Sequence, residues 1–138
     1  MSTRSVTVVQ ASGDSPAISL YRAHDGYLAV AGAAILDAVD QASYDRPAQA
    51  EDIVAHLLIG EPDGARNYEF TFSPEVHGDL EHIYHVNIAA GEVRVRHSWR
   101  GKSDRWESRE YTLAAFRAEV ESAEHEIRAR VEARRGAR

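Results

Sequence analysis

The feature that most constrains the fold is an alternation of apolar and polar residues over positions 80–100. Successive side chains of a β-strand point to opposite faces, so this alternation predicts strands with one buried face. That face is expected to hold Leu80, His82, Tyr84, Val86 and Ile88 in the first run and Val93, Val95, His97 and Trp99 in the second. Ala90-Gly91 lies between the two runs and suits a tight turn. The pattern therefore predicts a β-hairpin.

Shorter patterns predict the remaining elements. Further strands are expected over residues 6–9, 17–22, 68–72 and 106–111, and helices over 26–42, 47–60 and 113–134. Asp25 and Thr112 have side chains suited to cap the first and last helices, and Pro47 is a favoured first-turn residue. The aromatic residues expected in the core are Tyr68, Phe70, Phe72 and Tyr84.

The order of these elements, β-β-α-α-β-β-β-β-α, predicts the α+β class. We expect a mainly antiparallel β-sheet of about six strands, with helices packed on one face and a long C-terminal helix. The length of 138 residues predicts a single domain, 1–138, in which residues 133–138 form a disordered tail.

Composition narrows the classes of function. The chain has no cysteine, which excludes disulfides and thiolate chemistry. Its apolar runs are shorter than the roughly 20 residues of a membrane span, and its N-terminus does not resemble a secretory signal, so we expect a cytoplasmic protein without a membrane partner. The net charge of −6 argues against binding of duplex nucleic acid.

The charge is unevenly distributed along the chain. Residues 1–90 hold 4 Arg and 13 Asp or Glu, a net charge of −9, whereas residues 91–138 hold 12 Arg or Lys and 9 Asp or Glu, a net charge of +3. This asymmetry indicates either self-association, an anionic ligand on the basic half, or charge pairing between the halves.

The strongest candidate site is a basic strip over residues 94–109. Arg94 and Arg96 share one strand face, and Arg100 follows them. Arginine guanidinium groups bind phosphate oxygens with two parallel hydrogen bonds, and an aromatic residue such as Trp99, Trp106 or Tyr111 could stack on a base. The strip therefore predicts a phosphorylated or nucleotide-like ligand. The alternative is a solvated face paired with Glu92, Glu107 and Glu110.

Two other chemistries have less support. His77, His82 and His85 lie close in sequence, but His82 and His85 are an odd number apart and face opposite sides of a strand, so no metal site is predicted. A histidine beside a carboxylate, such as His77 with Asp79, could transfer protons. Asp25 as a helix cap and Asp79 as a turn residue are the simpler interpretation, so catalysis and a cofactor are not expected.

The last predicted helix has an apolar stripe that is about as long as the whole domain is wide. Its apolar residues recur at three- and four-residue steps, namely Leu113, Phe116, Val120, Ala123, Ile127 and Val131. At 1.5 Å per residue the helix is roughly 33 Å long, about the width of such a domain. The far end predicts either a homo-oligomer through this helix or a frayed, solvated end.

Two segments support a family resemblance, YRAHDGY at residues 21–27 and HGDLEHIY at residues 77–84. They resemble a family of small phage and prophage proteins of unknown function, also found in actinobacteria, with YRxxDGY and HGDxExxY segments. The resemblance implies a polar cluster of Arg22, Asp25, His77 and Asp79. His24 and His82 depart from it, because aromatic residues are expected at these two positions.

Together these observations predict a small phage-type binding protein that works without catalysis. It is expected either to sequester an anionic, nucleotide-like ligand or to mask a host protein. The ligand-binding residues predicted from the strip and the segments are Arg22, Asp25, His77, Asp79, Arg94, Arg96, Trp99 and Arg100. The alternative is a hydrolase or transferase that uses His77 and Asp79.

Overall fold

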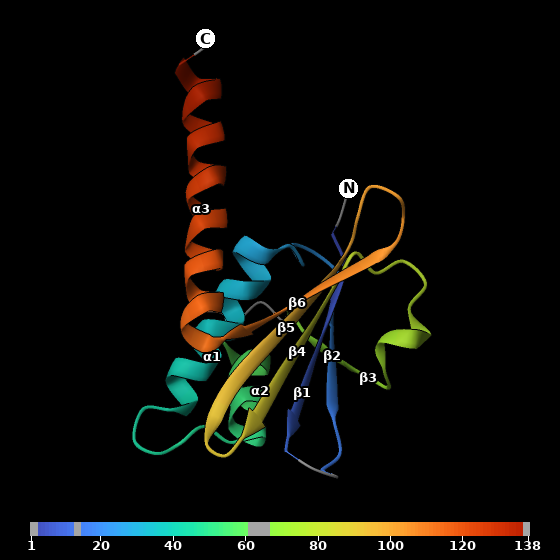
Figure 1. The fold of residues 1–138 in the computed structure, drawn as a ribbon, viewed down its shortest axis with the longest axis vertical. Helices are drawn as coiled ribbons and strands as arrows, with labels where there is room; N and C mark the ends of the chain where they lie inside the picture. Colours follow the sequence, from blue (N-terminus) through green and yellow to red (C-terminus); the bar gives the residue numbers. More distant parts are fainter. Residues whose placement is uncertain (1–2, 13–14, 61–66, 137–138) are drawn as a thin grey trace.

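A six-stranded sheet organises the molecule in the computed structural model, which describes residues 3–12, 15–60 and 67–136 (Figure 1). The strand order is β3-β2-β1-β4-β5-β6. The strands are β1 (Ser5–Ala11), β2 (Ile18–Arg22), β3 (Glu69–Thr71), β4 (His82–Ala89), β5 (Glu92–Arg100) and β6 (Trp106–Thr112). The α+β class predicted from the order of elements is confirmed.

One strand pair in the middle of the sheet is parallel. β1 lies parallel to β4, with Thr7 beside Tyr84, and every other pair is antiparallel. The hairpin of β4 and β5 turns at Ala90 and Gly91, whose φ angles are 52° and 79°. Two central residues with positive φ define the hairpin turn that matches the twist of the strands. The predicted hairpin is therefore confirmed.

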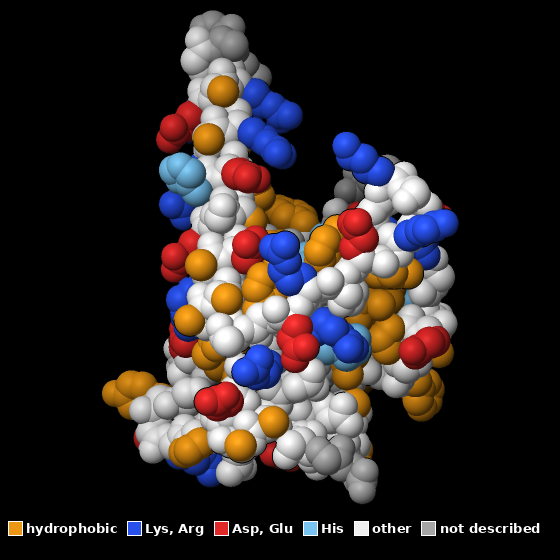
Figure 2. All heavy atoms as spheres, viewed as in Figure 1, with side chains coloured by type: hydrophobic (Ala, Val, Ile, Leu, Met, Phe, Trp, Pro, Cys, Tyr) orange, Lys and Arg blue, Asp and Glu red, His pale blue; other side chains and the backbone are white. Residues whose placement is uncertain are grey.

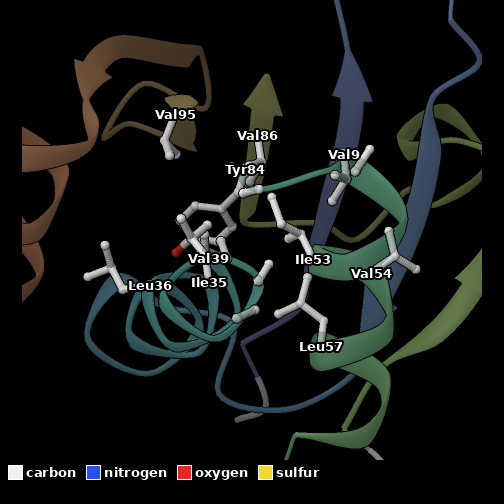
Figure 3. Close-up of a cluster of buried hydrophobic side chains, with 14 of the residues drawn as sticks. Val9, Ile35, Leu36, Val39, Ile53, Val54, Leu57, Tyr84, Val86 and Val95 are labelled. Carbon is white, nitrogen blue, oxygen red and sulfur yellow. The ribbon is translucent and has the colours of Figure 1, made fainter. Parts of the chain in front are cut away.

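The helices lie on one face of the sheet, where the main core is formed (Figures 1 and 3). Helix α1 (Ala33–Ala42) follows a π-helical turn, η1 (Leu28–Gly32), and α2 (Ala50–Ile59) lies beside α1. Side chains of both helices meet Val9, Tyr84, Val86 and Val95 of the sheet. The helical segments begin later than predicted, at Leu28 of η1 and Ala50 of α2, because Tyr27 and Gln49 directly before these residues have extended backbones.

Asp25 does not cap the first helix. Its φ angle is 56°, in the left-handed region, and the helical turn begins three residues later without a side-chain cap. Asp tolerates this backbone conformation better than most residues. The prediction of Asp25 as a capping residue is therefore wrong, and this residue instead belongs to a chain reversal between β2 and η1.

The opposite face of the sheet is covered only in part. The segment between β3 and β4, which contains the short 3-10 helix η2 (Pro74–Val76), places Leu80 against Val6 and Val8. Leu80 was predicted on the same face as His82, and this is wrong because β4 begins only at His82. Figure 1 shows this segment on the side of the sheet away from the helices.

Two predicted core aromatics lie on the surface. Phe70 and Phe72 are 67% and 96% exposed, whereas Tyr68 and Tyr84 are buried. β3 is an edge strand of three residues that pairs only with β2. An aromatic residue on such an edge is buried only where another element packs over it, so sequence alternation alone misplaced these two phenylalanines.

The last helix, α3 (Leu113–Gly136), projects beyond the rest of the molecule (Figure 1). Thr112 Oγ1 accepts a hydrogen bond from the Ala115 N–H at 3.2 Å, so the predicted cap is confirmed. The helix continues to Gly136, which differs from the disordered tail predicted from residue 133, while residues 137 and 138 lie outside the described residues. Within the described residues, no helix is long and apolar enough to cross a membrane.

Candidate functional site

The first polar segment, residues 21–27, forms a tightly packed chain reversal. The Gly26 N–H donates a hydrogen bond to the Thr3 carbonyl, and the Tyr84 hydroxyl donates one to the Gly26 carbonyl, both at 2.8 Å. A Cβ at Gly26 would lie 2.7 Å from Ser5 Cβ and 2.9 Å from the Ser5 backbone nitrogen. Only glycine fits so close to β1. The Asp25-Gly26 part of the segment is thus explained by its backbone conformation and packing.

We expect Gly26→Ala to lower the free energy of unfolding by about 1–3 kcal/mol, because the new methyl group would overpack against a paired strand. Urea unfolding followed by circular dichroism measures the change. Gly78→Ala is the matched control, since nothing lies within 4 Å of a Cβ at Gly78. Similar losses in the two variants would contradict the proposed contact.

The second polar segment, residues 77–84, makes separate contacts. The His77 ring stacks on Tyr21 at 4.3 Å between ring centres, and its Nε2 lies 2.7 Å from Thr71 Oγ1. Asp79 forms an ion pair with Arg4 at 2.8 Å. His77 and Asp79 thus contact different residues. His77 attaches the segment to β2 and β3, and Asp79 attaches it to Arg4, directly before β1.

The two segments meet, but their predicted polar residues do not converge. Arg22 is buried on the helix side of β2, where its Nε donates to the His24 carbonyl at 2.7 Å and its guanidinium lies over the Tyr68 ring. Its neighbour Tyr21 points to the other face and carries the stacked His77. Asp25 is exposed. Arg22 and His77 therefore belong to opposite sides of the sheet.

A histidine pair occupies the helix side of the sheet. His82 Nδ1 lies 2.8 Å from His97 Nε2, and the two rings stack on each other. Both rings also stack with Tyr84 of β4, which lies opposite His97 of β5. Trp99 lies against His97 at 5.1 Å between ring centres. As predicted, His85 faces the other side of β4 from His82. Among the described residues, no group of three His, Cys, Asp or Glu could hold a metal ion.

Burial keeps both paired histidines neutral. It lowers the pKa of His82 to about 4, and burial together with the charge of His82 lowers the pKa of His97 to about 3. In a neutral pair, one ring donates the shared hydrogen bond and the other accepts it. The two outer nitrogens then present one donor and one acceptor. This arrangement suits a fixed hydrogen-bonding role better than proton transfer near pH 7.

Sequence reasoning missed His97, although a signal for it was present. The two-residue turn at Ala90-Gly91 sets the hairpin register, in which Tyr84 lies opposite His97 and His82 opposite Trp99. Counting outward from the turn would have placed the two histidines on adjacent positions of one face.

The structure divides the basic strip between the two faces of the sheet. Its three arginines of β5, Arg94, Arg96 and Arg100, lie on the face away from the helices, whereas Arg109 of β6 lies on the helix side. Trp99 also points to the helix side. The aromatic residue beside these arginines is Trp106 rather than Trp99, because Trp106 lies opposite Arg100 on the same face and its ring centre is 5.3 Å from the Arg100 guanidinium. Arg100 also forms an ion pair with Asp104 at 2.8 Å.

Arg94 and Arg96 form no close ion pair among the described residues, although Glu110 lies opposite Arg96 in the strand register. Both are exposed, and neither forms an ion pair within 4.0 Å with any residue that the structure describes, including the predicted partners Glu92, Glu107 and Glu110. The pKa of the neighbouring His85 is lowered by burial and then by the charge of Arg96. The two guanidinium groups are therefore available to an anion.

A pocket of about 510 Å³ lies at the end of the strip. It is lined by Arg94 of β5, by Arg46 and its neighbours between α1 and α2, and by Thr112 and Leu113 where α3 begins. Arg46 is held by an ion pair with Asp52 at 2.7 Å. The N-terminal end of α3 and Arg94 favour negative charge there, whereas the charge of Arg46 is offset by Asp52 and Glu92 adds a negative charge to the lining. The volume falls within the range of about 300–1,000 Å³ that is typical of ligand sites.

Comparisons with known protein families, with curated proteins and with solved structures found no match. The resemblance to small phage proteins therefore stays a prediction based on the residues of the two polar segments.

Proposed function

We propose that the protein binds a phosphorylated, nucleotide-like ligand on the open face of its sheet and does so without catalysis. The observation that carries the proposal is the pair Arg94 and Arg96, two exposed guanidinium groups without an ion-pair partner among the described residues. Side chains two apart on a strand are separated by about 6.6 Å. This spacing suits a ligand with two or more phosphoryl groups.

The surroundings of the two arginines extend the site in both directions. On one side, the pocket between Arg46, Arg94 and the start of α3 accepts a terminal phosphoryl group. On the other side, Trp106 lies along the same face, about 13 Å from Arg96. A mononucleotide in the pocket would not reach Trp106, so a base stacked there requires a dinucleotide or a longer single strand.

Isothermal titration calorimetry with ATP, with the dinucleotide pApA and with inorganic triphosphate tests this proposal. The double variant Arg94→Gln/Arg96→Gln is expected to bind the best of these probes at least tenfold more weakly, because each lost charge-assisted contact is worth about 1.5–3 kcal/mol. Arg109→Gln is the control, since Arg109 is an exposed arginine on the helix-side face of β6. Equal binding by the double variant and the wild type would refute the site.

A second candidate function, masking of a host protein, is favoured by a different surface. Ile59 at the end of α2 is 76% exposed and lies with Phe70 around a hollow of about 550 Å³ beside β3. Exposed apolar patches of this kind commonly mark protein contacts. Failure of all three phosphorylated probes to bind would make this surface the better candidate.

The predicted hydrolase or transferase at His77 and Asp79 has less support. The ring of His77 is engaged by Tyr21 and Thr71, and the carboxylate of Asp79 by Arg4. These contacts account for both residues as parts of the fold.

A further inference from the structure

The projecting half of α3 carries two apolar residues that the described part of the chain leaves partly exposed. Only Phe116 and Val120 of this helix are buried, while Ile127 and Val131 are 36% and 42% exposed. Ile127 lies seven residues after Val120, which is about two helical turns, and Val131 lies four residues further on, so both are on the same side of the helix as the buried stripe. Figure 2 shows apolar side chains among charged ones along the projecting half of α3.

The charges of α3 change sign along the helix. Its acidic part holds Glu119, Glu121, Glu124 and Glu126, and its basic part holds Arg128, Arg130, Arg134 and Arg135 with the one acidic residue Glu132. Near the acidic part, Asp37 and Asp40 of α1 line a shallow groove with Glu121 and Glu124, where Arg117 pairs with Asp40 at 2.7 Å. An acidic half followed by a basic half is self-complementary only in an antiparallel pair.

We infer that a second copy of this chain docks antiparallel on the projecting half of α3. The pair is centred between Ile127 and Val131, so that Ile127 of each copy packs on Val131 of the other. This register covers both exposed residues of the stripe. In this register Gly136 of one copy lies level with Ser122 of the other, so the pair ends just before Val120, which the domain buries.

The same register places opposite charges side by side. With 1.5 Å rise and 100° per residue, Arg135 of one copy lies beside Glu124 of the other, offset by about 1.5 Å along the axis, and the twofold symmetry repeats this contact. In a parallel pair each residue would lie beside the same residue of the other copy, so that glutamates would face glutamates and arginines would face arginines. Charge complementarity thus favours a second copy in the antiparallel orientation over a parallel one.

Cysteine cross-linking tests the orientation, and the chain has no native cysteine to interfere. A disulfide requires Cα atoms within about 7 Å. In the proposed pair, the new cysteine of the Ile127→Cys variant would lie level with residue 131 of the other copy, but about 6 Å along the axis from the same cysteine of that copy. The same offset applies to the Val131→Cys variant. This axial offset adds to the distance between the helices and places identical cysteines too far apart for a disulfide. We therefore expect disulfide dimers when the two variants are mixed and little cross-linking of either variant alone.

Intact mass spectrometry distinguishes mixed from self-linked dimers, and light scattering coupled to gel filtration reports whether the wild type is a dimer. Self-linking of both single variants without mixed dimers would show a parallel pair. A wild type that remains monomeric at about 100 µM would overturn the proposal, since such an interface would then be weaker than about 5.5 kcal/mol.

Charge reversal tests the register independently. Glu124→Arg and Arg135→Glu are each expected to weaken the dimer about tenfold, and a mixture of the two variants is expected to restore it, because every arginine then faces a glutamate. Glu124 also lies 3.6 Å from Arg128 of its own helix, so circular dichroism must show unchanged helicity. Glu110→Arg and Arg105→Glu make the same charge changes away from α3 and should leave the dimer intact. No recovery in the mixture would refute the register.

Discussion

The free energy of unfolding is expected to fall by about 3 kcal/mol between pH 7 and pH 5, because the buried histidine pair resists protonation. Burial lowers the pKa of His82 to about 4 and is the main cause of the pKa of about 3 for His97. In the unfolded chain both histidines take up protons near pH 6.5. The folded state therefore loses stability through this whole interval.

The direction follows from the number of protons bound. Between pH 6.5 and pH 4 the unfolded state binds up to two more protons than the folded state at these histidines, so stability falls as pH falls, by up to about 2.7 kcal/mol per pH unit. His82 is partly exposed, which reduces its contribution to the loss of stability. His85, whose pKa is also lowered mainly by burial, adds a smaller effect of the same sign.

Urea unfolding at half-unit steps from pH 7 to pH 5 measures this dependence. The double variant His82→Leu/His97→Leu is expected to lose most of the slope, because leucine takes up no proton in either state. Replacing both partners at once with apolar residues of similar size leaves no hydrogen-bonding group unpaired. His125→Leu, at an exposed position of α3, is the control and should keep the slope. A double variant with the slope of the wild type would show that other groups cause the acid sensitivity.

The second large effect is expected at the base of α3, where Phe116→Ala should cost about 3–5 kcal/mol. Phe116 is fully buried and meets the rings of Tyr84 and Tyr111 at 6.5 and 5.8 Å between centres. Truncation leaves a cavity between α3 and the sheet, since neither tyrosine ring can move into the space without breaking its own contacts. One of these contacts is the hydrogen bond from Tyr84 to Gly26.

Phe72→Ala is the matched control, because the same truncation at a residue that is 96% exposed removes no packing. Its effect on the free energy of unfolding should stay within about 0.5 kcal/mol. Should Phe116→Ala fail to fold, Phe116→Leu provides a milder form of the same test, with an expected cost of about 1–1.5 kcal/mol. Equal effects of the two alanine variants would contradict the described packing of α3.

Local patterns were sufficient for most of the elements. The hairpin at Ala90-Gly91 and the cap at Thr112 were predicted because their signals involve residues within a few positions of one another. Predictions failed where a second element decides the outcome. Phe70 and Phe72 have the pattern of a buried strand, but they lie on an edge strand that the core does not cover.

The candidate site shows the same division. Alternation correctly placed Arg94 and Arg96 on one face, and the same alternation placed Trp99 on the other, so these three residues could not form one site on a flat sheet. Arg46 was not predicted, because it reaches the pocket beside Arg94 from a loop 48 positions earlier in the chain. Nothing in the neighbouring sequence of either arginine indicates the other.

The sequence by itself determined which side chains share a strand face, where the chain turns and where α3 begins, since these depend on backbone geometry over a few residues. Only the tertiary structure decided that β1 lies parallel to β4 and that Tyr84 reaches Gly26. These contacts join residues far apart in the chain. They depend on how the whole sheet is assembled and covered, and the buried apolar surface that drives this assembly has no local signature.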